Sequence, residues 1–297
     1  MKTIEDFLKP TQKQLFKILT EKYAGCTVNK DNYILVEGNA PLLLVAHLDT
    51  VHKEQVRVIC KSNSGNILMS PQGVGGDDRC GVYALTSIHE QAKIKPWLLF
   101  TCNEEIGGVG AEAFAEDFMQ GILPARLVGL KAIIEIDRKG KNDAVYYDCV
   151  NYDFENYITE KGFSTAFGSF SDISVIAPAL GIAAVNLSSG YYYAHTLYEY
   201  INKKHLDATI HRVLEMVEDA SKEDFPKYEY ASYDWEDWGH GNYSLCDTPK
   251  DLPKKYKKTY GELLDYYTYG EIESYRRAYG NDILNHLYNS VYNYDGR

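Results

Sequence analysis

The stretch PLLLVAHLDT, residues 41–50, passes from a purely apolar run straight into polar residues. The run 41–45 is typical of a strand that is buried on both faces. His47 and Asp49 follow two residues apart, so they point to the same side if the strand continues. In an open α/β sheet, ligands bind beyond the carboxyl ends of the strands, where the loops converge. The stretch therefore predicts a buried strand that ends in a functional site.

Apolar strand-like runs and amphipathic helix-like runs alternate around this stretch. Strands are expected near 33–37, 41–48, 56–61, 66–69, 97–102, 131–136, 144–150 and 183–188, and helices at 4–22, 80–93, 109–120, 151–161 and 205–222. This alternation predicts an α/β fold, a three-layer sandwich in which helices flank a mixed, mostly parallel central sheet.

The composition narrows the classes of protein to which the chain can belong. It has 297 residues, a net charge of −11, a pI near 5.2 and no basic stripe, which disfavours a nucleic-acid partner. No apolar segment approaches the roughly 20 residues that cross a bilayer, and the first residues lack the apolar core of a signal peptide. Six cysteines without a CxxC pair are read as reduced thiols. These features predict a cytoplasmic protein with no membrane or nucleic-acid partner.

The composition changes after about residue 224. Residues 1–224 are expected to form a single α/β domain, whereas residues 225–297 are dense in Tyr, Asp, Lys and Asn and poor in Val, Ile and Leu. Helices are expected near 259–268 and 271–289. Because disordered chains are poor in aromatic residues, this tyrosine-rich extension is expected to fold against the first domain or against a partner. It could carry the interface of a homo-oligomer.

Acidic and imidazole residues occur at five places, each at the end of a predicted strand or helix. They are HLD (47–49), GGDDR (75–79), NEE (103–105), Asp137 and His195. Taken singly, each has an ordinary explanation, such as a structural histidine, a helix cap or a charged helix face. Together they offer two imidazoles, at least four carboxylates and no thiolate, a set that suits Zn²⁺, Mn²⁺ or Co²⁺. Without a cation these acids would repel one another, so the set predicts a metal site.

In order and in wording, these motifs resemble the co-catalytic zinc exopeptidases and amidohydrolases. That superfamily includes aminopeptidases, peptidase T-like tripeptidases, carboxypeptidases and deacylases. The resemblance covers roughly residues 30–220 and does not reach the tyrosine-rich extension. The matching motifs are AHLDTV, GVGGDDRCG, NEEIGGVGAEAF, EIDR and SSGYYYAHTLYE.

The resemblance implies a pair of divalent metal ions, zinc in the first place and manganese or cobalt as alternatives. His47 and Asp137 would hold one ion, and Glu105 and His195 would hold the other. Asp77 would bridge the two ions, and in this superfamily the peptide bond after the matching Asp is often cis. The chain would thus be a metal-dependent hydrolase of peptide or amide bonds.

The resemblance also assigns two catalytic roles beside the metal ligands. Asp49 would hydrogen-bond to the imidazole of His47 and fix its tautomer. Glu104, next to a ligand but not itself one, would be the general base. It would take a proton from the water that the two ions activate, and then pass that proton to the leaving amine.

The spacing of the motifs favours the compact members of the superfamily. Some relatives insert a lid or a second domain between the motifs. Here the gap from HLD to GGDDR is short, and so is the gap from Asp137 to the SFSD stretch that ends at residue 172. Residues 1–224 are therefore expected to form the catalytic domain without an inserted lid.

The substrate remains open between several classes. Asp172 could hold the α-ammonium of a small peptide, as an aminopeptidase requires, or could cap the helix that follows. Arg138 or Arg79 could hold the carboxylate of an N-acylated amino acid, as a carboxypeptidase or deacylase requires, or could pair with surface acids. Tyr193 could line the pocket. A non-catalytic binding protein, in which the extension is the working part, is a third class.

The tyrosines next to Tyr193 have two explanations at this stage. Tyr191 and Tyr192 could also line the pocket wall, but packing is expected for at least one of the three.

Overall fold

The computed structural model describes residues 3–168 and 170–232, and from the extension residues 252–256, 259, 260, 263, 267, 272, 275, 276 and 280–292. These residues form two compact units. The larger comprises 3–165 and 170–232, and the smaller comprises 166–168 with the described residues from 252 onward.

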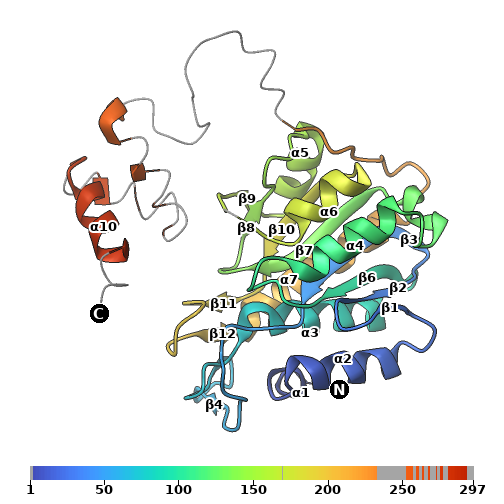
Figure 1. The fold of residues 1–297 in the computed structure, drawn as a ribbon, viewed down its shortest axis with the longest axis horizontal. Coiled ribbons are helices and arrows are strands. Elements are labelled where there is room, and N and C mark those ends of the chain that lie inside the picture. The colour runs from blue at the N-terminus through green and yellow to red at the C-terminus, as the bar shows by residue number, and fades with distance from the viewer. Residues whose placement is uncertain are drawn as a thin grey trace. The chain divides into compact units, whose positions relative to one another are not determined.

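The larger unit is built on a mixed sheet of eight strands in the order β1-β2-β6-β3-β7-β10-β8-β9 (Figure 1). The pairs β6–β3, β3–β7, β7–β10 and β8–β9 are parallel, whereas β1–β2, β2–β6 and β10–β8 are antiparallel. The strands are β1 (Thr27–Asn29), β2 (Tyr33–Val36), β3 (Ala40–His47), β6 (Pro96–Thr101), β7 (Ala132–Arg138), β8 (Asp143–Val145), β9 (Ser164–Thr165) and β10 (Ala184–Ser188). The predicted mixed, mostly parallel sheet is confirmed.

Helices cover both faces of this sheet. One face packs on a core that includes side chains of α2 (Gln12–Lys22), α3 (Gly76–Gln91), α5 (Tyr152–Glu160) and α7 (Lys203–Ala220). The other face packs on α4 (Val109–Met119) and α6 (Ile173–Leu180). The short helices α1 (Glu5–Leu8) and η1 (Ala125–Gly129) complete the unit. Two helical layers around one sheet make the three-layer sandwich that the alternation predicts.

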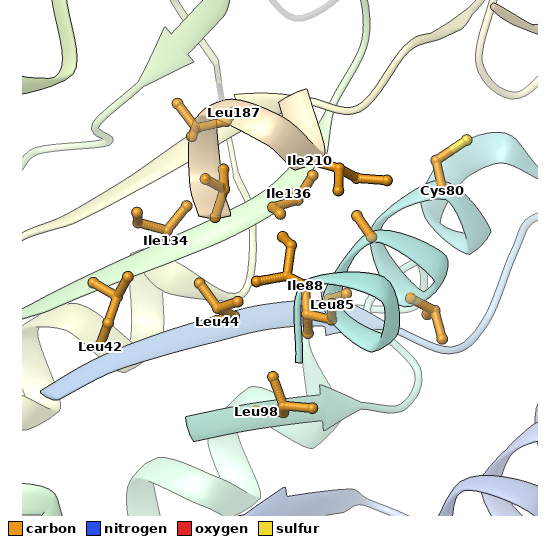
Figure 2. Packing of buried hydrophobic residues seen from close by; sticks show 14 of the residues in the cluster. Leu42, Leu44, Cys80, Leu85, Ile88, Leu98, Ile134, Ile136, Leu187 and Ile210 are labelled. Atoms are coloured by element: carbon orange, nitrogen blue, oxygen red, sulfur yellow. The ribbon is translucent and has the colours of Figure 1, made fainter. Parts of the chain in front are cut away.

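The alternation of side chains along β3 decides which face the functional residues occupy. Leu42 and Leu44 belong to the core on the α3 side, where they pack near Leu85 of α3 (Figure 2). Leu43 and Val45 belong to the core on the α4 side. Since side chains alternate along a strand, His47 continues the Leu43 series and lies on the α4 side at the carboxyl end.

The same parity places two more polar residues on that face. Thr101 of β6 follows Leu99, and Asp137 of β7 follows Ile133 by two steps of two residues; Leu99 and Ile133 both belong to the α4-side core. The carboxyl ends of three neighbouring strands therefore offer polar side chains to one region of space.

A second sheet of four short antiparallel strands, in the order β11-β12-β5-β4, frames the loop that carries His195. Its central contacts are made by Leu68 and Ile201, which pair in register and are fully buried. The strands are β4 (Cys60–Lys61), β5 (Ile67–Met69), β11 (Tyr191–Tyr192) and β12 (Tyr200–Asn202). This sheet holds the two ends of the loop 193–199.

Several boundaries differ from those expected. The single helix predicted at 4–22 is two helices, because Pro10 cannot continue a helix and Thr11 caps the second one with a capping box. Only Cys60–Lys61 of the strand predicted at 56–61 pairs, and the strand predicted at 144–150 ends at Val145. Helix α6 was not predicted, since SFSDISVIAPAL reads equally well as an apolar loop.

The smaller unit has a core of its own. Tyr260, Leu263, Ile272 and Leu284 are fully buried in it, and Phe167 from the segment 166–168 packs against it. Helix α10 (Ile283–Tyr292) and the turn η2 (Lys254–Tyr256) belong to this unit. The helix predicted near 259–268 lies mostly outside the described residues. The helix predicted at 271–289 overlaps α10, which begins only at Ile283 and continues to Tyr292.

Two observations bear on the expected environment of the protein. In the part of the chain that the structure describes, no helix combines the length and the apolarity needed to cross a membrane. Five cysteines are described and all are free; Cys80, Cys102 and Cys149 are buried, whereas Cys60 is exposed.

Candidate metal centre

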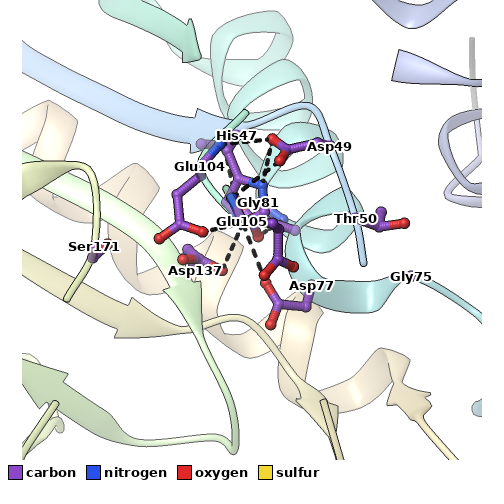
Figure 3. A network of polar contacts seen from close by, with 12 residues as sticks. His47, Asp49, Thr50, Gly75, Asp77, Gly81, Glu104, Glu105, Asp137 and Ser171 are labelled. Carbon is purple, nitrogen blue, oxygen red and sulfur yellow. Dashed lines mark hydrogen bonds and ion pairs between the residues drawn. The ribbon is translucent and has the colours of Figure 1, made fainter. Parts of the chain in front are cut away.

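Five elements deliver the predicted ligands to one place at the carboxyl edge of the main sheet. His47 ends β3, Asp137 lies near the end of β7, and Glu105 follows β6. Asp77 lies at the start of α3, and His195 lies in the loop between β11 and β12. Figure 3 shows four of these ligands converging from their separate elements. Residues up to 148 positions apart in sequence therefore share one site.

The first group of potential donors comprises His47, Asp77 and Asp137. Nε2 of His47 lies 3.2 Å from Oδ1 of Asp77 and 3.6 Å from Oδ1 of Asp137. One donor atom from each of the three residues lies within 4.8 Å of the others, so a single ion could contact all three.

The second group comprises Asp77, Glu105 and His195. Nε2 of His195 lies 3.2 Å from Oδ2 of Asp77 and 3.2 Å from Oε2 of Glu105. The donor atoms of this group also lie within 4.8 Å of one another. Asp77 turns one oxygen toward each group, which is the arrangement that a bridging carboxylate requires. The peptide bond between Asp77 and Asp78 is cis, as the resemblance implies.

Asp49 organises both the imidazole and the turn beside it. Its Oδ1 lies 3.2 Å from Nδ1 of His47 and accepts the backbone N–H of Glu104 at 3.1 Å, and its Oδ2 accepts the N–H of Glu105 at 3.1 Å. The turn that carries Glu104 and Glu105 begins at Asn103, whose backbone is left-handed, with a φ of +61°. One buried carboxylate thus fixes the ring of His47 and the positions of Glu104 and Glu105 together.

The chemistry of the donor atoms fits a pair of divalent cations. Asp49 accepts a hydrogen from Nδ1 of His47, so Nε2 is the ring atom that faces the oxygens of Asp77 and Asp137. In the neutral ring, Nε2 would offer its lone pair to a cation held between these oxygens. Oε1 of Glu105 is buried without a hydrogen-bond partner among the described residues. Nitrogen and oxygen donors without a thiolate suit Zn²⁺, Mn²⁺ or Co²⁺.

The shifted pKa values of the site in the absence of cations also indicate that it needs positive charge. Burial, and then the negative charges of Asp77 and Asp78, raise the pKa of Asp137 well above its usual range. Hydrogen bonds with Asp77 and Glu105 raise the pKa of His195 to about 10. Against the effect of burial, hydrogen bonds with His195 and His47 lower the pKa of Asp77. Without cations, protons on Asp137 and on the imidazoles thus balance part of the negative charge of the site, and divalent cations would take their place.

Glu104 lies beside both donor groups but is part of neither. Its Oε2 is 3.9 Å from Nε2 of His47, and the side chain is 13% exposed. Burial raises the pKa of Glu104 to about 8, an effect that the nearby carboxylates of Asp172 and Asp77 reinforce against His47. Glu104 is thus close to both groups of potential donors without belonging to either.

Asp172 is fully buried on the α4 side of the sheet, at the beginning of α6. It does not cap the helix with its side chain; instead Oγ1 of Thr101 donates to its Oδ2. Its Oδ1 has no hydrogen-bond partner among the described residues. Burial raises the pKa of Asp172 to about 6. Asp172 therefore places a carboxyl group near the site instead of capping α6, and the expectation of a capping side chain is wrong.

The two arginines have different surroundings. Arg79 is only 5% exposed, and its Nη1 donates to the backbone carbonyls of Phe7 at 2.9 Å and Pro10 at 2.8 Å. The alternative of a surface ion pair is therefore wrong for Arg79, whose guanidinium anchors the turn between α1 and α2. Arg138 is half-buried at the end of β7, next to Asp137.

The three consecutive tyrosines also differ. Tyr191 is buried, and its hydroxyl donates to the carbonyl of Asp137 at 3.1 Å. Tyr192 stacks on Tyr200 with ring centroids 4.9 Å apart. Tyr193 is 67% exposed and has a φ of +56°. Tyr191 and Tyr192 thus pack, as expected for at least one of the three, and only Tyr193 is free of the core.

The structure adds polar residues around the site to which the sequence analysis assigned no role, although Glu135 and Glu199 stand within the motifs EIDR and SSGYYYAHTLYE. Glu135 is fully buried two residues before Asp137, and Oγ of Ser171 donates to it. Asn186 accepts the backbone N–H of Asp137 at 2.9 Å. Glu199 is fully buried four residues after His195. A charged residue inside an otherwise apolar strand, as in AIIEI, was the physical signal for Glu135.

Comparisons with known proteins agree with the fold. No protein-family model and no curated protein matches the sequence. Among solved structures, a tripeptidase from Staphylococcus aureus subsp. aureus Mu50 is 16% identical, with a TM-score of 0.54 over 74% of this chain and 97% of that chain. Aminopeptidase PepT from Bacillus cereus is 16% identical, with a TM-score of 0.54 over 74% of this chain and 98% of that chain.

An archaeal enzyme shows the same likeness. An aminopeptidase from Desulfurococcus kamchatkensis is 14% identical, with a TM-score of 0.53 over 73% of this chain and 93% of that chain. The fold that the sequence motifs imply is therefore confirmed, and the chain is similar in architecture to exopeptidases of this type.

Proposed function

We propose that this protein is a metal-dependent aminopeptidase that releases N-terminal residues from small peptides. The observation that carries the proposal is the sharing of Asp77 between two groups of donors, with Glu104 beside both and part of neither. Two ions held in this way would polarise the scissile carbonyl and lower the pKa of a water that they share.

The protein's own residues supply the proton transfers and the orientation. Glu104 is the general base: its carboxylate takes a proton from the attacking water and then gives it to the departing amine. Asp49 keeps Glu104 in place through the backbone, because it accepts the amide hydrogen of that residue. Asp49 also holds the His47 ring with Nε2 directed at the site.

The surrounding charge favours a substrate with a free amino terminus. Asp172 and Glu135 are fully buried behind the donor groups, and each has one oxygen without a hydrogen-bond partner among the described residues. These two oxygens could accept hydrogen bonds from an α-ammonium group, whereas neither residue offers a positive charge to a substrate carboxylate. Arg79, which could have bound a substrate carboxylate, is engaged by backbone carbonyls. These contacts support an aminopeptidase over a carboxypeptidase or a deacylase.

The similar structures support the same activity, since the two with the highest TM-scores given above are described as a tripeptidase and an aminopeptidase. Zinc is the proposed metal, and manganese or cobalt would satisfy the same donors.

A substrate panel tests the proposal. Protein supplied with zinc, manganese or cobalt is assayed on amino-acid p-nitroanilides, on dipeptides and tripeptides, on the same peptides with an acetylated N-terminus, and on N-acetyl amino acids. We expect hydrolysis only where the amino terminus is free. Hydrolysis of N-acetyl amino acids would instead establish the deacylase alternative. Failure to bind metal and to cleave any substrate would leave a binding protein.

A further inference from the structure

The segment that carries Asp77 is not held by regular secondary structure. Gly73 and Gly75 have φ angles of +83° and +63°, and the backbone dihedrals of Asp77 itself are not helical. Asp77 nevertheless turns its two oxygens toward two different histidines, each at 3.2 Å. Something other than helix α3 must therefore fix the backbone at this position.

Glu199 fixes it. Oε1 of Glu199 accepts the backbone N–H of Asp77 at 3.0 Å, and Oε2 accepts the backbone N–H of Gly75 at 2.9 Å. The Glu199 side chain is fully buried, so water does not compete for these amides. Hydrogen bonds to an ionised acceptor are stronger than those between neutral groups. A single carboxylate thus spans the turn from which the bridging ligand projects.

His52 in turn holds the carboxylate of Glu199. Its Nε2 lies 2.9 Å from Oε2 of Glu199, and because a carboxylate can only accept, Nε2 carries the hydrogen. The ring lies against the same turn, since a Cβ added at Gly73 would be 2.2 Å from its Nδ1. Burial raises the pKa of Glu199, and the hydrogen bond from His52 opposes that effect. His52 therefore orients the carboxylate.

Glu199 and the metal-ligating residue His195 lie on one loop. The loop is closed internally, since the N–H of Glu199 donates to the carbonyl of Thr196 at 3.2 Å and Oγ1 of Thr196 donates to the carbonyl of Tyr193 at 2.8 Å. The loop therefore reaches Asp77 twice, through His195 at its carboxylate and through Glu199 at its backbone.

The first donor group shares Asp77 with the second, but its other two donors are held by contacts that do not involve Glu199. Asp49 orients His47, and the backbone N–H of Asp137 donates to Asn186 at 2.9 Å. The second group contains both Asp77 and His195, and His195 lies on the same loop as Glu199. A loss of Glu199 should consequently disturb the second group more than the first.

We propose that Glu199 is a positioning residue that aligns the Asp77 carboxylate with His195 and so sets the affinity of the Asp77–Glu105–His195 group for its metal ion. The inference rests on the metal site of the proposed function. It concerns which of the two ions is bound more weakly when Glu199 is changed, and the proposed function does not specify this.

Metal titration tests the inference without relying on activity. Chelator-stripped wild type and the variants Glu199→Gln, Glu199→Ala and His52→Ala are titrated with Co²⁺ and with Zn²⁺, by absorption spectroscopy and calorimetry. Glu199→Gln keeps the shape but turns an amide group toward a backbone donor. We expect the affinity for one of two ions to fall by roughly 10–100-fold, the usual effect of removing a partner of a ligand. The affinity for the other ion should change much less.

Met216→Ala in α7 is the matched control, because Met216 is fully buried in the same unit and lies on a helix that carries none of the donors. It should lower the Tm and leave both affinities unchanged. Two wild-type affinities in Glu199→Gln would overturn the inference, as would an equal loss in Met216→Ala. If Glu199→Ala does not fold, the titrations of Glu199→Gln and His52→Ala test the inference in its place. A wild type that binds fewer than two ions would overturn the proposed function itself, and this inference with it.

Discussion

At the scale of single residues, the site depends on carboxylates that each serve more than one neighbour. Asp77 turns one oxygen to His47 and one to His195, and Asp49 contacts His47 and the amides of Glu104 and Glu105. Removal of one such group leaves several others without a partner. Substitutions here are therefore expected to act together rather than additively.

Glu104→Gln should abolish turnover and keep the metal. The amide has nearly the shape of the carboxylate but cannot take a proton, and loss of a general base typically costs about 10²–10⁴-fold in rate. Metal content and kcat are measured on the same preparation. A metal-replete Glu104→Gln protein with normal turnover would contradict the assignment of Glu104 as base.

His195→Ala should lower the metal stoichiometry from two ions to one. His195 lies 3.2 Å from Asp77 and from Glu105, and among the described residues no other imidazole forms a donor group with both of them. Elemental analysis after dialysis against a weak chelator measures the stoichiometry. His211→Ala, which alters an exposed histidine on α7, is the control and should retain both ions.

At the scale of elements, the turn between β6 and α4 is set by a close approach of backbones. The N–H of Cys102 donates to the carbonyl of Asn32 at 2.8 Å, and the N–H of Gly110 donates to the carbonyl of Cys102 at 2.9 Å. A Cβ on Gly110 would lie 2.5 Å from the carbonyl oxygen of Asn32. The helix can approach the strand this closely only with glycine at position 110.

Gly110→Ala should destabilise the protein and weaken metal binding. The added methyl would push α4 away from β6 and shift the turn that carries Glu105, at a cost of about 1–3 kcal/mol. Thermal unfolding and zinc affinity are the measurements. Gly129→Ala is the matched control, because a Cβ at that position meets nothing within 4 Å. Equal Tm values for the two variants would contradict the packing argument.

At the scale of the whole molecule, the site concentrates the negative charge of an already acidic chain. The net charge is −11, and Asp78, Glu135, Asp172 and Glu199 are fully buried near the donor groups. Buried carboxylates without counterions oppose folding, so bound cations should stabilise the folded state.

Removal of metal should therefore lower the Tm. Zinc present at 100 times its Kd stabilises a one-site protein by about 2.7 kcal/mol, and each kcal/mol moves the Tm of a domain of this size by roughly 2–4 °C. Calorimetric scans with and without chelator measure the shift. A double variant His47→Ala with His195→Ala is the control and should not respond. A chelator that leaves the wild-type Tm unchanged would contradict the metal site.

The sequence by itself determined the layers and the edge of the sheet at which the candidate donors gather. The apolar runs in β3, β6 and β7 specify buried strands, and a polar residue directly after such a run has to lie at the carboxyl edge of the sheet. That is why His47, Asp137 and Glu105 could be named from the motifs that contain them. The boundaries of short elements were less certain, because strands such as β4 exist only through pairing with a neighbour.

Only the tertiary structure decided how the ligands are supported. Glu199 holds Asp77 from 122 residues away, and Asn186 holds Asp137 from 49 residues away. The motif SSGYYYAHTLYE contains Glu199 but does not reveal its partner, because a backbone amide can donate to an acceptor of any sequence context. The partners of Arg79 were equally unmarked in the sequence. Its charge predicts an exposed side chain, but Arg79 is buried and donates to the carbonyls of Phe7 and Pro10. Local periodicity places residues on faces, whereas partners across the sheet are chosen by the three-dimensional path of the chain.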